Sequence, residues 1–210
     1  MKPAGPGAVR LPPHAPGMRI GLYGGSFDPP HAGHRHVAAT ALRRLGLDRV
    51  WWLVTPRNPL KTRGDIGPRA ARLAAARRVA RHPRMEALDI ESAIGARFTV
   101  ETVRFLQRRC PGVRFVWIMG ADSLADFQRW RSWREIAARL PIAVVDRPRH
   151  GLRSTRGRAA VVLASSRHRE GAAIRLAAAP PPAWALLHGP LSELSSTVLR
   201  AEGRRESRLR

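Results

Sequence analysis

The 210-residue sequence contains a single cysteine, Cys110, so an internal disulfide is excluded. Its surroundings, "QRRCPGV", offer neither a helix N-terminus nor a histidine that would activate the thiol. Long apolar runs are also missing, since none approaches the roughly 18 residues needed to cross a bilayer. The N-terminus lacks the apolar stretch that a secretory signal requires. We therefore expect a cytoplasmic protein with no membrane partner, whose cysteine has no catalytic role.

Acidic residues and lysines are scarce. The chain has 15 Asp and Glu against 38 Lys and Arg, and Lys2 and Lys61 are its only lysines, for a formal net charge of +23. Such an excess of positive charge is typical of proteins that bind polyanions. The arginines, however, are scattered along helical patterns such as "RAARLAAARRVAR". We interpret them as solvated surface, predict no specific nucleic-acid partner, and expect only weak, salt-sensitive binding of RNA.

Proline and glycine are concentrated at the N-terminus. Residues 1–17 hold five prolines and three glycines without any periodicity, which predicts a disordered leader. Residues 18–203 are interpreted as one domain, because 44% hydrophobic residues in a chain of this length suffice for one core. Residues 204–210, "RRESRLR", are expected to form a frayed tail.

Short apolar runs alternate with helical patterns along the rest of the chain. Strands are predicted at 18–24, 49–55, 85–92, 113–120, 141–148, 159–164 and 183–189, and helices at 34–46, 68–82, 98–110, 122–130, 132–140 and 195–203. Strands separated by helices imply right-handed crossovers and a mostly parallel sheet. The sequence thus predicts an α/β fold, a Rossmann-like doubly wound sheet with helices on both faces.

The first predicted strand runs into "GGSFDPPHAGH" at 24–34, which places His31 and His34 around Gly33 where a helix begins. In open parallel sheets, ligands bind beyond the carboxyl ends of the strands, and the free N–H groups of a helix N-terminus favour phosphate. Two imidazoles there can donate to one phosphate and strengthen those bonds as charge develops. The spacing favours a phosphate site. The alternatives are histidines that only cap the helix, or a metal site, for which no cysteine or carboxylate cluster is nearby.

This segment resembles the G-G-x-F-x-P-x-H-x-G-H signature of the nucleotidylyltransferase superfamily, in the version carried by bacterial nicotinate-nucleotide adenylyltransferases. Near the C-terminus, "SSTVLR" at 195–200 is similar to the second family signature, S-S-T-x-[IL]-R. The segments "TPRNPLK", "RFTVETV" and "MGADSLADFQRWRSW" resemble that family in order and spacing. The resemblance extends from residue 18 to about residue 203.

The resemblance implies a nucleotidyltransferase of NAD biosynthesis. ATP is the co-substrate and nicotinate mononucleotide the acceptor, and the products are deamido-NAD and pyrophosphate. Mg²⁺ is expected to accompany ATP, bound mainly through phosphate oxygens and water, without a metal site built by the protein. Because the mononucleotide brings its own nucleophile, the enzyme needs to supply only alignment and charge stabilisation.

The resemblance also implies roles for individual residues. His31 and His34 are the expected catalytic residues, in contact with the α-phosphate. The expected ATP-binding residues are Gly24, Gly25, Ser26, Phe27, Gly33, Gly120, Asp122, Ser196, Thr197 and Arg200, and those for nicotinate mononucleotide are Lys61, Thr99 and Trp130. Some have a structural alternative: Asp122, Ser196 and Thr197 can cap helices, and Trp130 can belong to the core. We assign Trp51, Trp52 and Trp117 to the core.

The chain departs from the family pattern where tyrosine is common, at Phe98 and Arg131, and in "RPRHG" at 147–151. Three alternatives stay open. An enzyme that prefers nicotinamide mononucleotide shares the motifs, and a phosphopantetheine adenylyltransferase shares the first signature but is typically shorter and lacks the "GADS" segment. An RNA-binding protein on a nucleotide-binding fold is suggested by charge alone. It would bind nucleic acid tightly at physiological salt and be indifferent to changes at His31 or His34.

Overall fold

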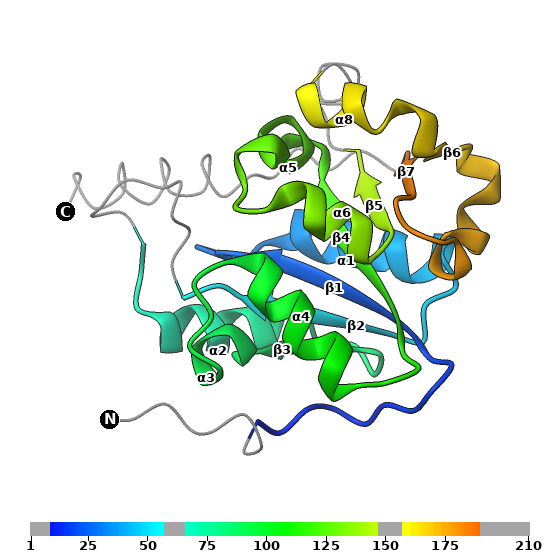
Figure 1. Cartoon of the computed structure of the whole chain (residues 1–210). Helices are drawn as coiled ribbons and strands as arrows, with labels where there is room; N and C mark the ends of the chain where they lie inside the picture. Colours follow the sequence, from blue (N-terminus) through cyan, green and yellow to red (C-terminus); the bar gives the residue numbers. More distant parts are fainter. Residues whose placement is uncertain (1–8, 57–65, 147–156, 190–210) are drawn as a thin grey trace.

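A seven-stranded sheet forms the centre of the computed structural model, which describes residues 9–56, 66–146 and 157–189 (Figure 1). Its strand order is β3-β2-β1-β4-β5-β7-β6, and every neighbouring pair is parallel. The strands are β1 (Arg19–Gly25), β2 (Arg49–Val54), β3 (Met85–Leu88), β4 (Arg114–Gly120), β5 (Ile142–Val145), β6 (Arg167–His168) and β7 (Trp184–Leu187). The predicted Rossmann-like α/β fold is confirmed.

Helices connect the strands and cover both faces of the sheet; in Figure 1, α4 lies in front of it and α1 behind. The α-helices are α1 (Ala32–Arg44), α2 (Arg69–Val79), α3 (Ile90–Ala93), α4 (Thr99–Arg109), α5 (Ala121–Asp126), α6 (Trp133–Arg139) and α8 (Arg158–Val162). The 3₁₀ helices are η2 (Phe127–Arg129), η3 (Ala164–Ser166) and η4 (Glu170–Ala178). Most predicted elements are therefore present with shifted ends, and the helix predicted at 195–203 lies outside the described residues.

The central strands supply side chains alternately to two cores, one on each face of the sheet. In β2, Trp51 packs into the core that α4 and α6 cover, whereas Trp52 packs into the core beneath α1 and α2. In β4, Trp117 and Val116 divide in the same way. The three tryptophans are at most 1% exposed, which confirms their assignment to the core. Burial on both faces explains why these strands read as continuous apolar runs.

The direction of winding changes beside β1. After β1 the chain adds β2 and β3 on one side, then returns to place β4 and β5 on the other side. In doubly wound sheets a ligand crevice opens at this switch point, beyond the carboxyl ends of the two diverging strands. The segment after β1 and the segment after β4 therefore meet at the expected ligand-binding edge.

The N-terminal segment differs from its prediction. Residues 1–17 are expected to be disordered, but Val9 is 7% exposed within the core on the α4 face. The ring of His14 meets Trp51 edge to face, with ring centroids 5.8 Å apart. Residues 9–17 form neither a helix nor a strand, yet they place Val9 and the ring of His14 against the core. Composition alone is therefore misleading for residues 9–17, and the rest of the leader lies outside the described part.

The strand predicted at 159–164 is wrong, because these residues begin in helix α8. Ala159 and Ala160 are buried, whereas Val161 and Val162 are 63% and 48% exposed. Two buried residues followed by two exposed ones fit the turn of a helix, while a strand would alternate singly. The two valines favour a strand by propensity, but the burial of Ala159 and Ala160 in the core on the α4 face fits a helix.

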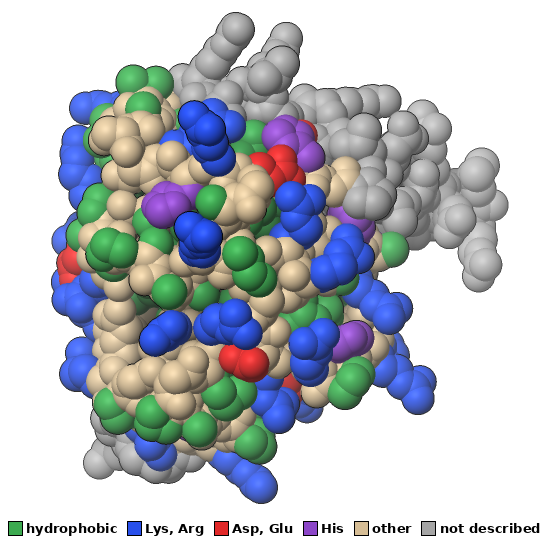
Figure 2. Space-filling view, turned by 90° about the vertical axis from the view of Figure 1, so that its right-hand side faces the viewer, with side chains coloured by type: hydrophobic (Ala, Val, Ile, Leu, Met, Phe, Trp, Pro, Cys, Tyr) green, Lys and Arg blue, Asp and Glu red, His purple; other side chains and the backbone are tan. Residues whose placement is uncertain are grey.

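The described surface carries its basic side chains at many separate places; on the face shown in Figure 2 they lie between apolar and polar groups. This distribution agrees with the interpretation of arginine as solvated surface. Among the helices over residues 9–56, 66–146 and 157–189, none has both the length and the apolar character of a membrane span.

Candidate active site

The carboxyl end of β1 is shaped by what lies beneath it. A Cβ atom on Gly24 would come within 2.7 Å of the Trp117 ring, and one on Gly25 within 3.0 Å of the Phe27 ring. Since real Cβ contacts are essentially never this short at Gly24, the strand end reaches its position only because glycine stands there. Close packing against the core thus explains Gly24, one of the two glycines expected to bind ATP, and leaves little room beside Gly25.

Phe27 anchors the loop that follows. Its φ of 47° is uncommon for a residue other than glycine, and its ring is 2% exposed. The ring stacks on Trp52 with centroids 5.0 Å apart and meets His34 edge to face at 5.1 Å. The ring therefore belongs to the core and holds the loop in place from below. Ser26, by contrast, is partly exposed.

His31 and His34 form a reciprocal cap at the start of α1. His31 is the N-cap residue, and its Nδ1 accepts a hydrogen bond from the Gly33 N–H at 3.1 Å. The His34 Nδ1 accepts in turn from the His31 N–H at 3.2 Å. A ring nitrogen that accepts carries no proton, so in both neutral rings the proton is on Nε2. The cap therefore fixes each imidazole as an Nε2–H donor.

The two rings lie together at the helix N-terminus, with centroids 3.9 Å apart and planes inclined by 50°. His31 is 5% exposed, whereas His34 is partly exposed. Capping and phosphate binding, which sequence analysis treats as alternatives, are compatible here because each function uses a different ring nitrogen. The arrangement can present N–H donors and the positive end of a helix dipole to an anion.

Gly120 and Asp122 stand at the second strand of the switch point. β4 ends at Gly120, which is the N-cap residue of α5, and Asp122 is exposed in the first turn of that helix. Because β4 pairs with β1, this turn and the histidine loop leave the sheet at the same edge. Asp122 lies within the helix and not at its N-cap position, and its side chain is exposed at this end of the sheet.

Two of the residues expected at the nicotinate end, Thr99 and Trp130, lie in the described part of the chain. Thr99 is the first residue of α4, and the carboxylate of Glu101 fixes this turn by accepting the Phe98 N–H at 3.2 Å. Trp130 is partly buried and meets Trp117 edge to face at 6.0 Å, the same ring that underlies Gly24. Trp117 thus links the expected stacking residue to the strand end that carries the histidine motif.

Four expected site residues lie outside the described residues: Lys61, Ser196, Thr197 and Arg200. The segment 147–151, which differs from the family pattern, also lies outside them. Over the described residues, no group of three or more His, Cys, Asp or Glu side chains is placed to hold a metal ion.

Sequence reasoning missed two arginines. The Arg131 guanidinium lies over the Phe98 ring, 5.8 Å from its centroid, so the two positions that depart from the family pattern contact each other.

Arg72 is 3% exposed on α2, although the arginines of that helix are expected at the surface. Its position four residues before the buried Ala76 is the sequence signal that places it on the inner face.

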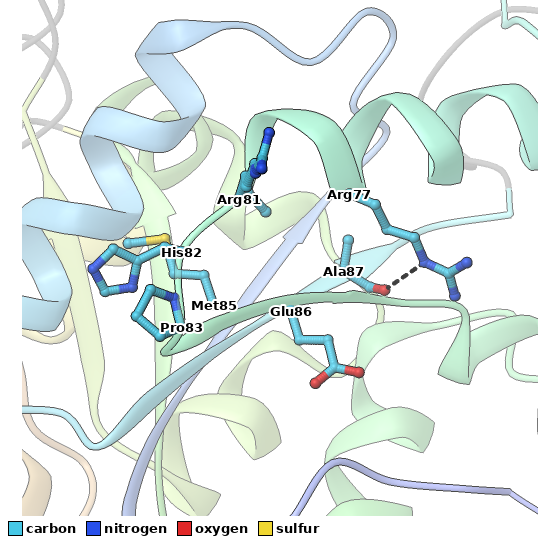
Figure 3. Close-up of a pocket in the computed structure, with 8 residues that line it drawn as sticks. Arg77, Arg81, His82, Pro83, Met85, Glu86 and Ala87 are labelled. Atoms are coloured by element: carbon cyan, nitrogen blue, oxygen red, sulfur yellow. Dashed lines mark hydrogen bonds between the residues drawn. The ribbon is translucent and has the colours of Figure 1, made fainter.

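A hollow of about 670 Å³ lies elsewhere, along the outer strand β3 (Figure 3). Its lining residues are Arg77, Ala80, Arg81, His82, Pro83, Met85, Glu86 and Ala87. None of the expected site residues lines it, and β3 is separated from β1 by β2. This hollow is therefore distinct from the switch point.

Comparison with known proteins finds relatives over nearly the whole chain. A family model described as cytidylyltransferase-like matches residues 22–202, which include both signature motifs. A relative from Methylorubrum extorquens, named probable nicotinate-nucleotide adenylyltransferase, is 58% identical over 183 residues, which are 87% of this chain and 99% of the relative. A relative of the same name from Cereibacter sphaeroides is 57% identical over 187 residues, 89% of this chain and 99% of its own length.

Among solved structures, the nicotinic acid mononucleotide adenylyltransferase of Plasmodium falciparum complexed with NaAD is similar, with a TM-score of 0.64 and 16% identity. The match covers 88% of this chain and 83% of that chain, and at this identity it shows a shared fold. The family model and the closely matching relatives together show that the chain belongs to the cytidylyltransferase-like family and, within it, to the nicotinate-nucleotide adenylyltransferases.

Proposed function

We propose that this chain joins ATP and nicotinate mononucleotide to give deamido-NAD and pyrophosphate, with the reaction centred on the reciprocal cap of His31 and His34. The observation that carries this proposal is the cap itself: two imidazoles with fixed Nε2–H donors at a helix N-terminus, at the switch point of the sheet. The names of relatives 57–58% identical to the chain support the same reaction.

The reaction needs no covalent catalyst from the protein, which only positions the substrates and stabilises the developing charge. A 5′-phosphate oxygen of the mononucleotide attacks the α-phosphorus of ATP and forms a new P–O bond. The bond from the α-phosphorus to the bridging oxygen breaks, and its electrons leave with pyrophosphate. Negative charge grows on the oxygens around the α-phosphorus and on the leaving group, so fixed donors aimed there lower the barrier.

The neutral tautomer suits the histidines to this task. Each ring offers one Nε2–H donor without needing a proton from solvent, and its Nδ1 is already occupied by the cap. The partly exposed His34 meets the α-phosphate first, and His31 supports it from below. The free N–H groups of the α1 N-terminus add to the attraction of the anion.

The second signature supplies side chains for the other two phosphates of ATP. Ser196, Thr197 and Arg200 hold the β- and γ-phosphates, and Lys61 meets a phosphate of the substrates. Arginine suits the β- and γ-phosphate site because its planar guanidinium can bind two phosphate oxygens at once. Mg²⁺ arrives with ATP and takes its ligands from phosphate oxygens and water. Gly120 and Asp122 border the adenosine.

At the nicotinate end, Trp130 stacks on the pyridine ring and Thr99 supplies a polar contact. Trp130→Ala is expected to raise the KM for the mononucleotide about tenfold more than the KM for ATP, the equivalent of roughly 1.4 kcal/mol of lost ring contact. Steady-state kinetics with each substrate varied in turn measures this difference. Trp130→Phe, which keeps a ring against Trp117, should restore most of the affinity. An equal rise in both constants would return Trp130 to the core.

Incubation with ATP and Mg²⁺ tests the reaction directly, with pyrophosphate release followed for nicotinate mononucleotide and, separately, for nicotinamide mononucleotide. We expect faster release with the nicotinate compound and a deamido-NAD product identified by mass. Faster release with the amide would assign the chain to the alternative specificity. Release with neither, together with tight RNA binding at physiological salt, would favour the RNA-binding alternative.

A further inference from the structure

Arg72 is buried on the inner face of α2. It is 3% exposed, while Arg69, Arg77 and Arg78 of the same helix are exposed. Arginine is almost never fully buried unless its charge and its donors are matched. Its burial therefore requires hydrogen-bond acceptors within the fold, because the reaction proposed above assigns Arg72 no contact with a substrate.

The partners of Arg72 are four main-chain carbonyl groups. Nη1 donates to the oxygens of Ser26 at 2.6 Å and Thr55 at 2.9 Å. Nη2 donates to Pro56 at 2.9 Å, and Nε donates to Gly67 at 2.9 Å. These carbonyls belong to the loop after β1, the stretch after β2 and the stretch before α2. A planar fork with five N–H groups can join them at one point, whereas the compact ammonium of lysine cannot.

The same junction includes Asp28, two residues beyond Ser26. Its Oδ2 accepts from the Gly67 N–H at 3.3 Å, so a second bond ties the histidine loop to the stretch before α2. Burial lowers the pKa of Arg72, and the negative charge of Asp28 opposes that effect. The buried cation is thus matched both by carbonyl dipoles and by a carboxylate of the loop that it holds.

The loop between Ser26 and His31 is held from two sides. The Phe27 ring is fixed in the core against Trp52, and the carbonyl of the preceding residue is fixed by Arg72. His31, at the end of this short loop, sets the cap of α1. A displacement at Ser26 would therefore be passed to the histidines with few residues to absorb it.

We propose that Arg72 is a positioning residue for the reaction, which holds the loop from Ser26 to His31 in the conformation that aims the two imidazoles at the α-phosphate. The inference rests on the proposed roles of His31 and His34. It assigns to Arg72 no contact with substrate.

The test compares Arg72→Met with Arg78→Met, which removes an exposed arginine from the same helix. We expect Arg72→Met to lower kcat per folded molecule about 10- to 100-fold, because a misplacement on the order of 1 Å can cost a hundredfold in rate. Arg78→Met should retain wild-type kcat. Arg72→Lys, which keeps the buried charge beside Asp28 but not the fork, should fold if the methionine variant does not and should show an intermediate loss.

Chemical rescue separates positioning from stability. In Arg72→Ala, added guanidinium at millimolar concentration should raise kcat at least about fivefold, because the free ion can occupy the site of the missing fork. Methylammonium, which lacks the fork, should not. Guanidinium weakens folded proteins, so it would worsen a defect that was only one of stability. Wild-type kcat in Arg72→Met, or activity in Arg72→Ala that guanidinium does not restore, would overturn the proposal.

Calorimetric binding of ATP gives a readout that does not depend on the acceptor. We expect Arg72→Met to bind ATP about tenfold more weakly than Arg78→Met, since the α1 N-terminus is displaced. If the wild type binds ATP but turns over neither mononucleotide, the proposed reaction fails while this comparison still tests Arg72. Equal affinities in the two variants would contradict the positioning role.

Discussion

Replacing His34 by alanine is expected to lower kcat/KM at least about a hundredfold, with the fold intact. The change removes the Nε2–H donor that we assign to the α-phosphate, and the loss of one such donor typically costs 10²- to 10³-fold in rate. It also removes the acceptor of the His31 N–H, which costs about 1 kcal/mol of helix stability. Pyrophosphate release measures the first effect, and urea unfolding measures the second.

Two further variants separate the donor from the cap. Asparagine places an oxygen where His34 has Nδ1, so His34→Asn keeps an acceptor for the His31 N–H but has no group at Nε2. Glutamine places an amide nitrogen near the Nε2 position, so His34→Gln keeps a donor. We expect the asparagine variant to be stable and slow, and the glutamine variant to recover part of the rate. Full turnover in His34→Asn would contradict the assigned role.

A matched control comes from Arg35, which is exposed on the same turn of α1. Arg35→Ala should leave both turnover and stability close to those of the wild type, because surface changes of this kind usually alter the free energy of unfolding by less than about 0.5 kcal/mol. A loss in Arg35→Ala equal to that in His34→Ala would show that any disturbance of this turn slows the reaction. The donor would then not be the cause.

The parts of the fold that could be predicted from sequence are those in which one local pattern decides. The runs that become β1, β2 and β4 are apolar on both faces because helices cover both sides, and such runs separated by helical patterns are typical of a parallel sheet. The histidine motif is predictable for a similar reason. Gly24, Gly25 and the pair at His31 and His34 place unusual residues at a strand end, where ligands bind in parallel sheets.

What sequence reasoning missed depends on distant contacts. Arg72 belongs to an arginine-rich pattern, and its burial follows from carbonyls that the fold brings together from Ser26, Thr55, Pro56 and Gly67. The packing of Val9 likewise depends on a core assembled from later strands. The contact between Arg131 and Phe98 joins two loops whose separation along the chain conceals their proximity. Local propensity carries no information on such pairs.

Glu91, on α3, lies outside the proposed reaction but contributes to how stability depends on pH. It is 5% exposed, and burial raises the pKa of its carboxyl to about 8; the interaction with Thr102 opposes this rise, and the negative charge of Asp89 adds a smaller contribution to it. A carboxyl so placed keeps its proton in the folded protein at pH values where the unfolded chain has released it. Ionisation therefore favours the unfolded state.

Replacing Glu91 by glutamine is expected to raise the free energy of unfolding by about 5 kcal/mol above pH 8 and to leave it nearly unchanged below pH 4.5. Between these values Glu91 keeps its proton in the folded protein and has lost it in the unfolded chain, so its contribution to stability falls as pH rises; glutamine cannot ionise and removes that contribution. Urea unfolding across this range measures the difference. Glu86→Gln, which alters an exposed carboxyl of β3, should keep the wild-type pH dependence. Parallel stability curves for Glu91→Gln and the wild type would mean that the buried carboxyl does not titrate in this range.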